Sequence, residues 1–272
     1  MDTLTRLATA LVLLAVLVPA IYLGGAPAVA VLVAVFGGIA LWELANGLAA
    51  LKSGPGRWIT PLLGVLIVGL FLVVPYRALP AVLVFFPLLV LILHLALYHV
   101  IENTIESTAE MVLALAYVAV PLSHAVALRK LDEGIGWVFF VLLTICLGDV
   151  GAYFTGRYLG RHRITPNVSP GKTLEGLGGV LLGSFAGMLV IKLVFPGLPD
   201  LVRVLVPLTV ALAVVGPLGD LLASAIKRKV GIKDYGSIFP GHGGVMDRAD
   251  SLILAIPVTF YYLVLFGYSV PK

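Results

Sequence analysis

The chain has 272 residues, of which 60% are hydrophobic and only 12% are charged, and its mean hydropathy is +1.10. A water-soluble domain averages about 25% charged residues, so this chain lacks the polar groups that would cover a globule of its size. The composition therefore excludes a water-soluble enzyme, a disordered tail and a fibrous protein. The single cysteine, Cys146, excludes an intrachain disulfide. We expect a polytopic membrane protein.

Apolar runs of about the length of a membrane span recur along the whole chain. A bilayer core is about 30 Å thick, which a helix crosses with roughly 20 apolar residues. These runs are continuous rather than alternating, so the predicted fold is all-α, a transmembrane helical bundle and not a barrel. Reading the runs against glycine and proline breaks predicts nine helices, at about 5–23, 27–50, 58–76, 78–100, 108–128, 135–156, 174–196, 201–229 and 250–269.

Lysine and arginine are distributed unequally between the two sides of such a bundle. The side that holds the N-terminus and the even-numbered connections carries 12 of the 18 basic residues, and the other side carries five. Positive charge near membrane spans favours the cytoplasmic side. We therefore expect an integral protein of the cytoplasmic membrane, with its N-terminus and its polar site facing the cytoplasm.

Polar residues divide the chain into two functional regions. Residues 1–134 contain few of them and are predicted to be scaffold helices, whereas 135–272 are predicted to form the catalytic region. Within the scaffold, Glu43 and His94 lie inside apolar runs. An ionisable residue within the membrane is a functional candidate, but a hydrogen bond at a packing interface is the simpler interpretation of each.

Helical spacing groups several polar residues of the second region. Side chains three or four positions apart share a helix face, which places Asp149, Tyr153 and Arg157 on one face of the sixth helix. The eighth helix, about 29 residues long, would measure roughly 43 Å and exceed the bilayer core. One face of it carries a carboxylate that we expect near the membrane interior, followed by groups nearer the cytoplasmic surface: Asp220, Ser224, Lys227 and Arg228.

The connection after the eighth helix is rich in glycine. Gly243 and Gly244 predict a flexible turn, where backbone N–H groups can approach a ligand closely. Asp247 follows beside Arg248 at the start of the ninth helix. Mg²⁺ typically takes one or two carboxylates and completes its shell with water and substrate phosphates, while Lys and Arg neutralise the remaining phosphate charge. The residue types therefore indicate a site for Mg²⁺ and a polyphosphate.

The same residues resemble the signature of the phosphatidate cytidylyltransferases, also called CDP-diacylglycerol synthases. The matching string is Ser224-x-x-Lys227-Arg228-x4-Lys233-Asp234-x-Gly236-x-x-Phe239-Pro240-x-His242-Gly243-Gly244-x-x-Asp247-Arg248-x-Asp250. The segments at 148–157 and 169–176 are also similar to blocks of this family. The chain departs from the family's usual residues at Val150 and Gly171.

The resemblance implies transfer of CMP from CTP to phosphatidate, which gives CDP-diacylglycerol and pyrophosphate for phospholipid synthesis. Mg²⁺ is the implied cofactor, with two ions expected and a monovalent cation left open, and its expected ligands are Asp220, Asp247 and Asp149. The expected catalytic residues are Asp220, Asp247, Lys227, Arg228 and Lys233. The expected substrate-binding residues are Ser224, His242, Gly243, Gly244, Arg248, Lys172, Ser169 and Arg157.

Two other functions remain open. A CTP-dependent kinase of a lipid alcohol, such as phytol or a polyprenol, would use similar groups and release CDP. An ion-coupled transporter would use Asp149 and Asp220 without consuming CTP. The expected partners are CTP, phosphatidate and membrane lipids, with no nucleic acid, and a homodimer is left open.

Overall fold

The computed structural model describes residues 3–48, 51, 54, 56–75, 79–98, 104–238 and 243–268. The predicted substrate-binding residue His242 lies outside the described residues, as does the side chain of His94. By its internal contacts, the chain divides into two compact units. Unit 1 comprises Met1–Ala127 and Val230–Ala249, and unit 2 comprises Leu128–Lys229 and Asp250–Lys272.

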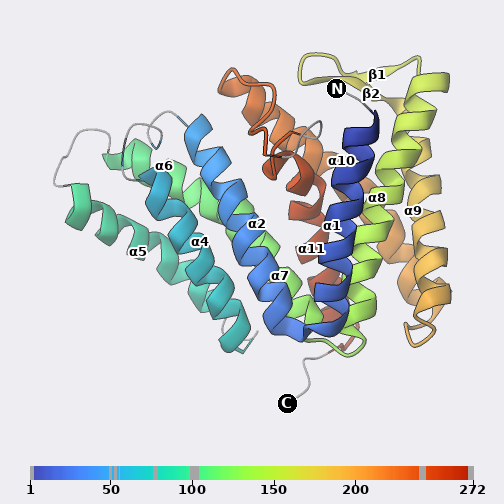
Figure 1. Cartoon of the computed structure of the whole chain (residues 1–272), viewed down its shortest axis with the longest axis horizontal. Helices are drawn as coiled ribbons and strands as arrows, with labels where there is room; N and C mark the ends of the chain where they lie inside the picture. The colour runs from blue at the N-terminus through green and yellow to red at the C-terminus, as the bar shows by residue number, and fades with distance from the viewer. Residues whose placement is uncertain are drawn as a thin grey trace. The chain divides into compact units, whose positions relative to one another are not determined.

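All nine predicted helices are present among the described residues (Figure 1). Unit 1 contains α1 (Thr3–Leu23), α2 (Gly25–Gly47), α4 (Gly56–Val73), α5 (Leu79–Tyr98), α6 (Thr104–Ala114) and the π-helical turn η2 (Leu115–Ala119). The same helix continues as α7 (Val120–Arg129), and the later helices are α8 (Gly134–Leu159), α9 (Leu174–Val194), η3 with α10 (Leu201–Leu205, Val206–Lys229) and α11 (Met246–Leu265).

Seven of these helices, all but α1 and α5, are long and apolar enough to cross a membrane. The described parts of α1 and α5 contain shorter apolar stretches, Leu14–Leu23 and Val84–Leu93. Large apolar side chains lie outward on the helices, as at Leu182 and Leu193, which are 71% and 80% exposed. A bilayer solvates such faces, and a helix satisfies its own backbone hydrogen bonds there. The all-α fold is confirmed, and the chain is an integral membrane protein.

Unit 1 is built around α2, which packs along α4 (Figure 1) and also contacts η2. Its fully buried side chains include Leu41 and Leu44 of α2 and Leu115 of η2. The predicted scaffold and catalytic regions do not coincide with the compact units, since the connection Val230–Ala249 groups with the N-terminal helices. The division by function stays a prediction.

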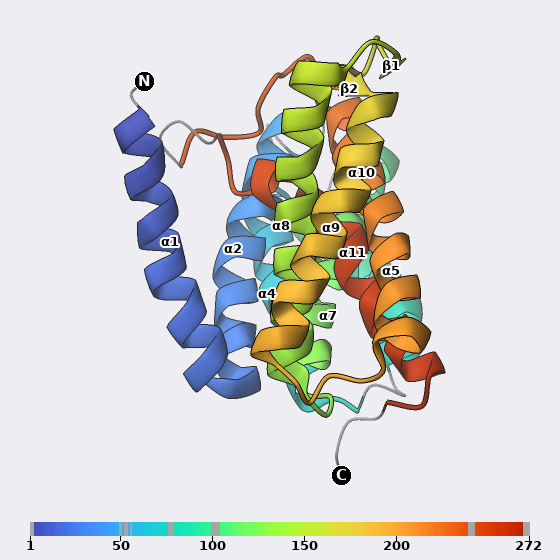
Figure 2. The ribbon, with the colours of Figure 1, turned by 90° about the vertical axis from the view of Figure 1, so that its right-hand side faces the viewer.

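Unit 2 is built around the pair α8 and α9, which lie side by side in Figure 2. Glycines allow the two backbones to approach closely, as small residues do between membrane helices. A Cβ at Gly151 would collide with the Gly179 carbonyl, and a Cβ at Gly183 would collide with the Leu147 carbonyl. This contact fixes the middle of α8, where Asp149 lies, against the first half of α9.

A short antiparallel hairpin joins α8 to α9 and adds two strands to the predicted all-helical chain. Strands β1 (Arg163–Thr165) and β2 (Ser169–Thr173) pair in this hairpin. Thr173 caps α9 by accepting a hydrogen bond from the Gly176 N–H at 3.1 Å. Glu175 accepts the backbone N–H groups of Arg161 and His162 at 3.0 and 3.2 Å. Part of the polar segment at 169–176 therefore fastens the hairpin to α9.

Candidate active site

The signature residues are divided between the two units. Ser224, Lys227 and Arg228 lie on α10 in unit 2, together with Asp220. The connection that carries Lys233, Gly243, Gly244, Asp247 and Arg248 belongs to unit 1. Each group is described within its own unit.

Asp220 of unit 2 has two side-chain partners. Its Oδ2 lies 2.8 Å from the Lys172 Nζ, and its Oδ1 accepts a hydrogen bond from the Ser224 hydroxyl at 3.3 Å. The Ser224 contact is the four-residue spacing on which the prediction of a shared helix face depended. The Asp220 side chain is 37% exposed and the Lys172 side chain 19% exposed. The carboxylate is therefore accessible, and cationic and hydroxyl groups already surround it.

Lys172 and Arg228 tie the hairpin to α10. Lys172, on β2, also donates to the Pro217 carbonyl at 2.8 Å. The exposed Arg228 donates through Nε to the carbonyl of Val168, at the turn of the hairpin, at 3.3 Å. Lys172 therefore reaches Asp220 from the hairpin that precedes α9. Whether either side chain binds phosphate stays a prediction.

Asp250 is a residue that the sequence analysis left without a role. It lies on α11 in unit 2 and interacts electrostatically with Asp220, Asp149 and Lys227. A Cβ at Gly219 would collide with the Asp250 carbonyl, so α10 and α11 approach closely beside Asp220. The only signal in the sequence was its place at the end of the signature, and at the start of a predicted helix the helix dipole alone favours a negative charge.

Arg157 and Ser169 lie on the elements that flank the hairpin. Arg157, near the end of α8, donates to the Tyr153 hydroxyl at 2.5 Å and lies over that ring. This contact confirms that the two residues share a helix face. Ser169 begins β2 and pairs with Thr165 of β1. Arg157 is exposed and Ser169 is partly buried, and the substrate-binding role of both stays a prediction.

Asp247 of unit 1 is buried and bound to backbone groups. It lies in the first turn of α11, is 7% exposed, and its Oδ2 accepts the N–H groups of Tyr235 and Gly244 at 2.9 and 3.1 Å. Gly243 has a φ of +80°, which L side chains rarely adopt. The sequence predicts a flexible turn here with N–H groups available to a ligand, whereas the structure shows the Gly244 N–H donated to Asp247. This hydrogen bond joins Gly244 to the first turn of α11.

Glu43 of unit 1 has a hydrogen-bond partner that the sequence did not reveal. It lies on α2, is 2% exposed, and its Oε2 accepts the Met246 N–H at 2.9 Å. The interpretation of Glu43 as a hydrogen bonder at a packing interface is confirmed. The first residue of α11, Met246, donates this hydrogen bond, and the helix begins there rather than at the predicted residue 250. Its carboxylate inside an apolar run was the only signal.

Lys233 and Arg248 are exposed, and both lie in the segment Val230–Ala249 of unit 1. Neither is buried by the turn that surrounds Asp247, so both can neutralise an anion that approaches from solvent. In unit 2, Lys227 is partly buried on α10. The described residues therefore present cations both on α10 and on the connection that follows it.

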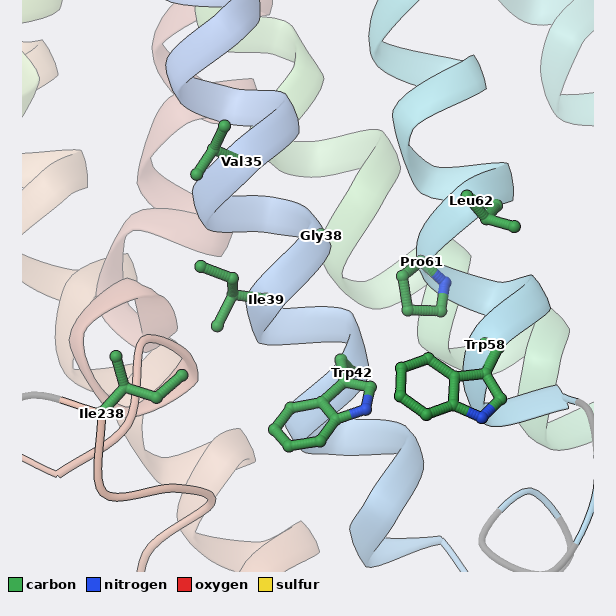
Figure 3. A pocket seen from close by; sticks show the side chains of 8 residues that line it. All are labelled: Val35, Gly38, Ile39, Trp42, Trp58, Pro61, Leu62 and Ile238. Carbon is green, nitrogen blue, oxygen red and sulfur yellow. The ribbon is translucent and has the colours of Figure 1, made fainter.

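An apolar groove crosses the surface of unit 1 beside this connection (Figure 3). It has a volume of about 380 Å³ and is lined from α2 by Gly38 and Trp42, from α4 by Trp58 and Leu62, and from the connection by Ile238. Arg57 lies over the Trp58 ring at 4.8 Å. The groove thus combines apolar walls with aromatic and cationic groups at one end.

The carboxylates of each unit have the oxygen chemistry that Mg²⁺ prefers, and magnesium binding stays a prediction. Within the described ranges, no three His, Cys, Asp or Glu side chains form a group that could hold a metal ion. Mg²⁺ commonly binds through one or two carboxylates, with water and substrate phosphates as its other ligands. Asp220, Asp247 and Asp149 supply oxygen ligands of the kind Mg²⁺ prefers.

Comparison with known proteins identifies relatives for this chain. A profile of the cytidylyltransferase family matches residues 4–266. A phosphatidate cytidylyltransferase of Bacillus subtilis is 38% identical over 172 residues, which are 60% of this chain and 61% of that protein. A phosphatidate cytidylyltransferase of Staphylococcus epidermidis is 39% identical over 146 residues, 54% of this chain and 55% of that protein.

An uncharacterized protein of Escherichia coli, YnbB, is 43% identical over 148 residues, 52% of this chain and 49% of that protein. The matched region thus spans about half to three fifths of the length of these relatives.

Proposed function

The chain belongs to the cytidylyltransferase family, and from that premise we propose that it is an enzyme that transfers CMP from CTP to phosphatidate. The observation that supports this proposal best is the environment of Asp220. An accessible carboxylate lies 2.8 Å from the Lys172 amine and within hydrogen-bond distance of Ser224, on the helix face that continues to Lys227. Such a site combines a metal-binding group with cations for phosphate.

The reaction itself requires little acid–base chemistry. A phosphate oxygen of phosphatidate attacks the α-phosphorus of CTP, a new P–O bond forms, and the bond to the β-phosphate breaks to release pyrophosphate. The attacking oxygen is already anionic at neutral pH, so no strong general base is needed. The main barrier is repulsion between two anionic substrates, and catalysis consists of positioning and charge neutralisation.

The site residues divide these tasks. Asp220, Asp247 and Asp149 would hold Mg²⁺, which neutralises charge on the triphosphate when it is bound. Phosphate oxygens would be bound by Lys227, Arg228, Lys233 and Arg248. Ser224, His242, Gly243 and Gly244 would shape the nucleotide site, and the hairpin side would supply Lys172, Ser169 and Arg157.

The lipid substrate would approach from the membrane. Its acyl chains remain in hydrocarbon while its phosphate reaches the interface, and the groove beside Ile238 supports this path because its walls are apolar. The charge distribution supports a cytoplasmic membrane location, with the N-terminus and the site on the cytoplasmic side. A homodimer stays a prediction, which cross-linking in membranes would test.

The test is the fate of the α-phosphate of CTP. Detergent-purified protein is incubated with Mg²⁺, phosphatidate and CTP labelled at the α-phosphate, and label is followed into the lipid phase. We expect labelled lipid with an equal amount of pyrophosphate, and none after EDTA. The variant Glu106→Gln is the matched control, since Glu106 is an exposed carboxylate in the first turn of α6.

Other outcomes would overturn the proposal. Release of CDP with unlabelled lipid would indicate a CTP-dependent kinase of a lipid alcohol. Ion flux in sealed vesicles without CTP consumption would indicate a transporter.

A further inference from the structure

Glu43, on α2, forms a hydrogen bond with the start of α11. Its Oε2 accepts the Met246 N–H at 2.9 Å, across a separation of 203 residues. Met246 is the first residue of α11 and directly precedes Asp247. The first N–H groups of a helix have no partner within the helix. Glu43 of α2 therefore supplies a hydrogen-bond acceptor to the first N–H group of α11.

Two glycines of the connection lie against the same carboxylate. A Cβ at Gly244 would lie 2.5 Å from Glu43 Oε2 and 2.6 Å from Oε1, and a Cβ at Gly236 would collide with Oε1. The carboxylate therefore occupies a space that exists because both residues lack a side chain. Gly236 and Gly244 are near the two ends of the turn, so one side chain contacts both.

Asp247 holds the same turn from another position. Its Oδ2 accepts the N–H groups of Tyr235 and Gly244, and Glu43 lies near enough to interact electrostatically with Asp247. Gly244 thus contacts Glu43 through its Cα side and Asp247 through its N–H. Displacement of the Glu43 carboxylate would move the residue that Asp247 binds.

A carboxylate is a costly choice for packing alone at this place. Among the described residues, the buried Glu43 Oε1 has no hydrogen-bond partner, and a buried oxygen without a partner is destabilising. A hydrocarbon side chain of similar volume would avoid this cost, but it could not accept the Met246 N–H. The hydrogen bond to the connection is therefore the feature that distinguishes Glu43 from an apolar packing residue.

We propose that Glu43 is a positioning residue that fixes Gly236 and residues 244–247 and thereby orients Asp247 for the reaction. It acts through its hydrogen bond to Met246 and its contacts with Gly236 and Gly244, without itself touching substrate. The inference rests on the proposed function, because Asp247 is given its role there.

Two variants of Glu43 and one control test the proposal. Glu43→Leu keeps similar volume but removes the acceptor, whereas Glu43→Gln keeps an oxygen that can accept the Met246 N–H. Glu110→Gln is the matched control, since Glu110 is a carboxylate of unit 1 that accepts a different backbone N–H, that of Leu51, at 3.1 Å. Turnover, the KM for CTP and the Mg²⁺ concentration for half-maximal rate are measured, together with hydrogen exchange of the peptide covering 243–247.

We expect Glu43→Leu to lower kcat at least ~10-fold, because a displacement of about 1 Å in a catalytic site can reduce a rate ~10²-fold. The KM for CTP should change less than about threefold, and more Mg²⁺ should be needed. Exchange at 243–247 should rise in this variant. Glu43→Gln should remain within about threefold of the parent in kcat, and Glu110→Gln should change exchange near Leu51 only.

Three results would overturn the inference. Glu43→Leu could fold and match Glu110→Gln in kcat and in exchange at 243–247. Glu43→Gln could lose as much activity as Glu43→Leu. Glu43→Gln could also lose activity without any change in exchange, which would assign the role of Glu43 to its charge rather than to positioning. Glu43→Gln tests the positioning role even where Glu43→Leu fails to fold. If the parent protein transfers no CMP, the proposed function fails, while hydrogen exchange still shows whether Glu43 holds the connection.

Discussion

Asp220 and Asp247 belong to one signature, yet the structure surrounds them differently. Asp220, in unit 2, is 37% exposed and contacts the side chains of Lys172 and Ser224. Asp247, in unit 1, is 7% exposed and accepts two backbone N–H groups. The hydrogen-bond and ion-pair partners described for Asp220 are rotatable side chains, whereas the two hydrogen bonds described for Asp247 come from the main chain.

This difference separates two roles that the sequence presents as equivalent. A carboxylate with side-chain partners can exchange them for a cation without any change in the fold. A carboxylate bound to the main chain fixes the turn around it as well as offering oxygen to a ligand. We therefore expect loss of Asp220 to affect chemistry alone, and loss of Asp247 to affect both chemistry and local structure.

The largest effect is expected for Asp247→Asn. Turnover should fall at least ~10²-fold because a metal ligand is lost, and the thermal midpoint should fall by a few degrees because two hydrogen bonds to a charged acceptor are weakened. Radiolabelled lipid formation and thermal unfolding in detergent measure the two effects. An unchanged midpoint would show that the backbone contacts of Asp247 contribute little to the turn.

Asp220→Asn should lower turnover by a similar factor, at least ~10²-fold, while the thermal midpoint stays at the parent value. The physical reason is that its partners Lys172 and Ser224 are side chains that can turn toward solvent. The control is Asp200→Asn in the same unit, because Asp200 accepts the Arg203 N–H at the start of η3 and asparagine caps helices equally well. Turnover near the parent value in Asp220→Asn would remove Asp220 from the site.

Two glycines provide a smaller and matched test of the same contrast. A Cβ at Gly244 would lie 2.5 Å from the Glu43 carboxylate, whereas one at Gly171, on β2, would meet nothing within 4 Å. Gly244→Ala should therefore reduce turnover at least ~10-fold by displacing the turn. Gly171→Ala should leave turnover within about twofold, since exposed substitutions are generally neutral. Equal effects in lipid labelling would contradict the close packing at Gly244.

The fold was largely predictable because a bilayer imposes length and composition on each span. The eighth helix was predicted at 201–229 and ends at Lys229 as expected. The hairpin was not predicted, and its contacts with α10 join residues distant in sequence: Lys172 with Pro217, and Arg228 with Val168. Periodicity within one helix does not contain such contacts.

For the candidate site too, the contacts within one helix or turn were predictable and the contacts between distant segments were not. The contact between Asp220 and Ser224 follows from helical spacing, and the positive φ of Gly243 follows from its place in a glycine-rich turn. The contact between Glu43 and Met246 spans 203 residues, so only the packing of α2 against the connection reveals it. Local rules thus identified the residues, and tertiary contacts identified their partners.

A fourth prediction concerns the competition for Asp220. Lys172→Met removes the amine that lies 2.8 Å from the carboxylate, so Mg²⁺ should reach half-maximal activation at a lower concentration. Turnover should nevertheless fall roughly fivefold, since the amine no longer neutralises substrate phosphate and one exposed charge contact contributes at most about 1 kcal/mol. Lys192→Met is the control, because Lys192 of α9 donates to the Pro196 carbonyl at 2.9 Å. A higher Mg²⁺ requirement in Lys172→Met would show that Lys172 assists metal binding instead of competing with it.

The smallest effect is expected in the groove of unit 1. Gly38 lines it, and the nearest atom to a Cβ at this position is Val65 Cγ2 at 3.8 Å, an ordinary contact. Gly38→Leu should fill part of the groove and raise the KM for long-chain phosphatidate about two- to fivefold, as expected when roughly one methylene of the acyl chain loses its contact. Gly69→Leu on α4 is the control, since a Cβ there meets nothing within 4 Å. Because Ile238 of the connection also lines the groove, the KM for CTP distinguishes two roles. A change confined to phosphatidate assigns the groove to the lipid, whereas a change confined to CTP would mean that the groove only supports the connection.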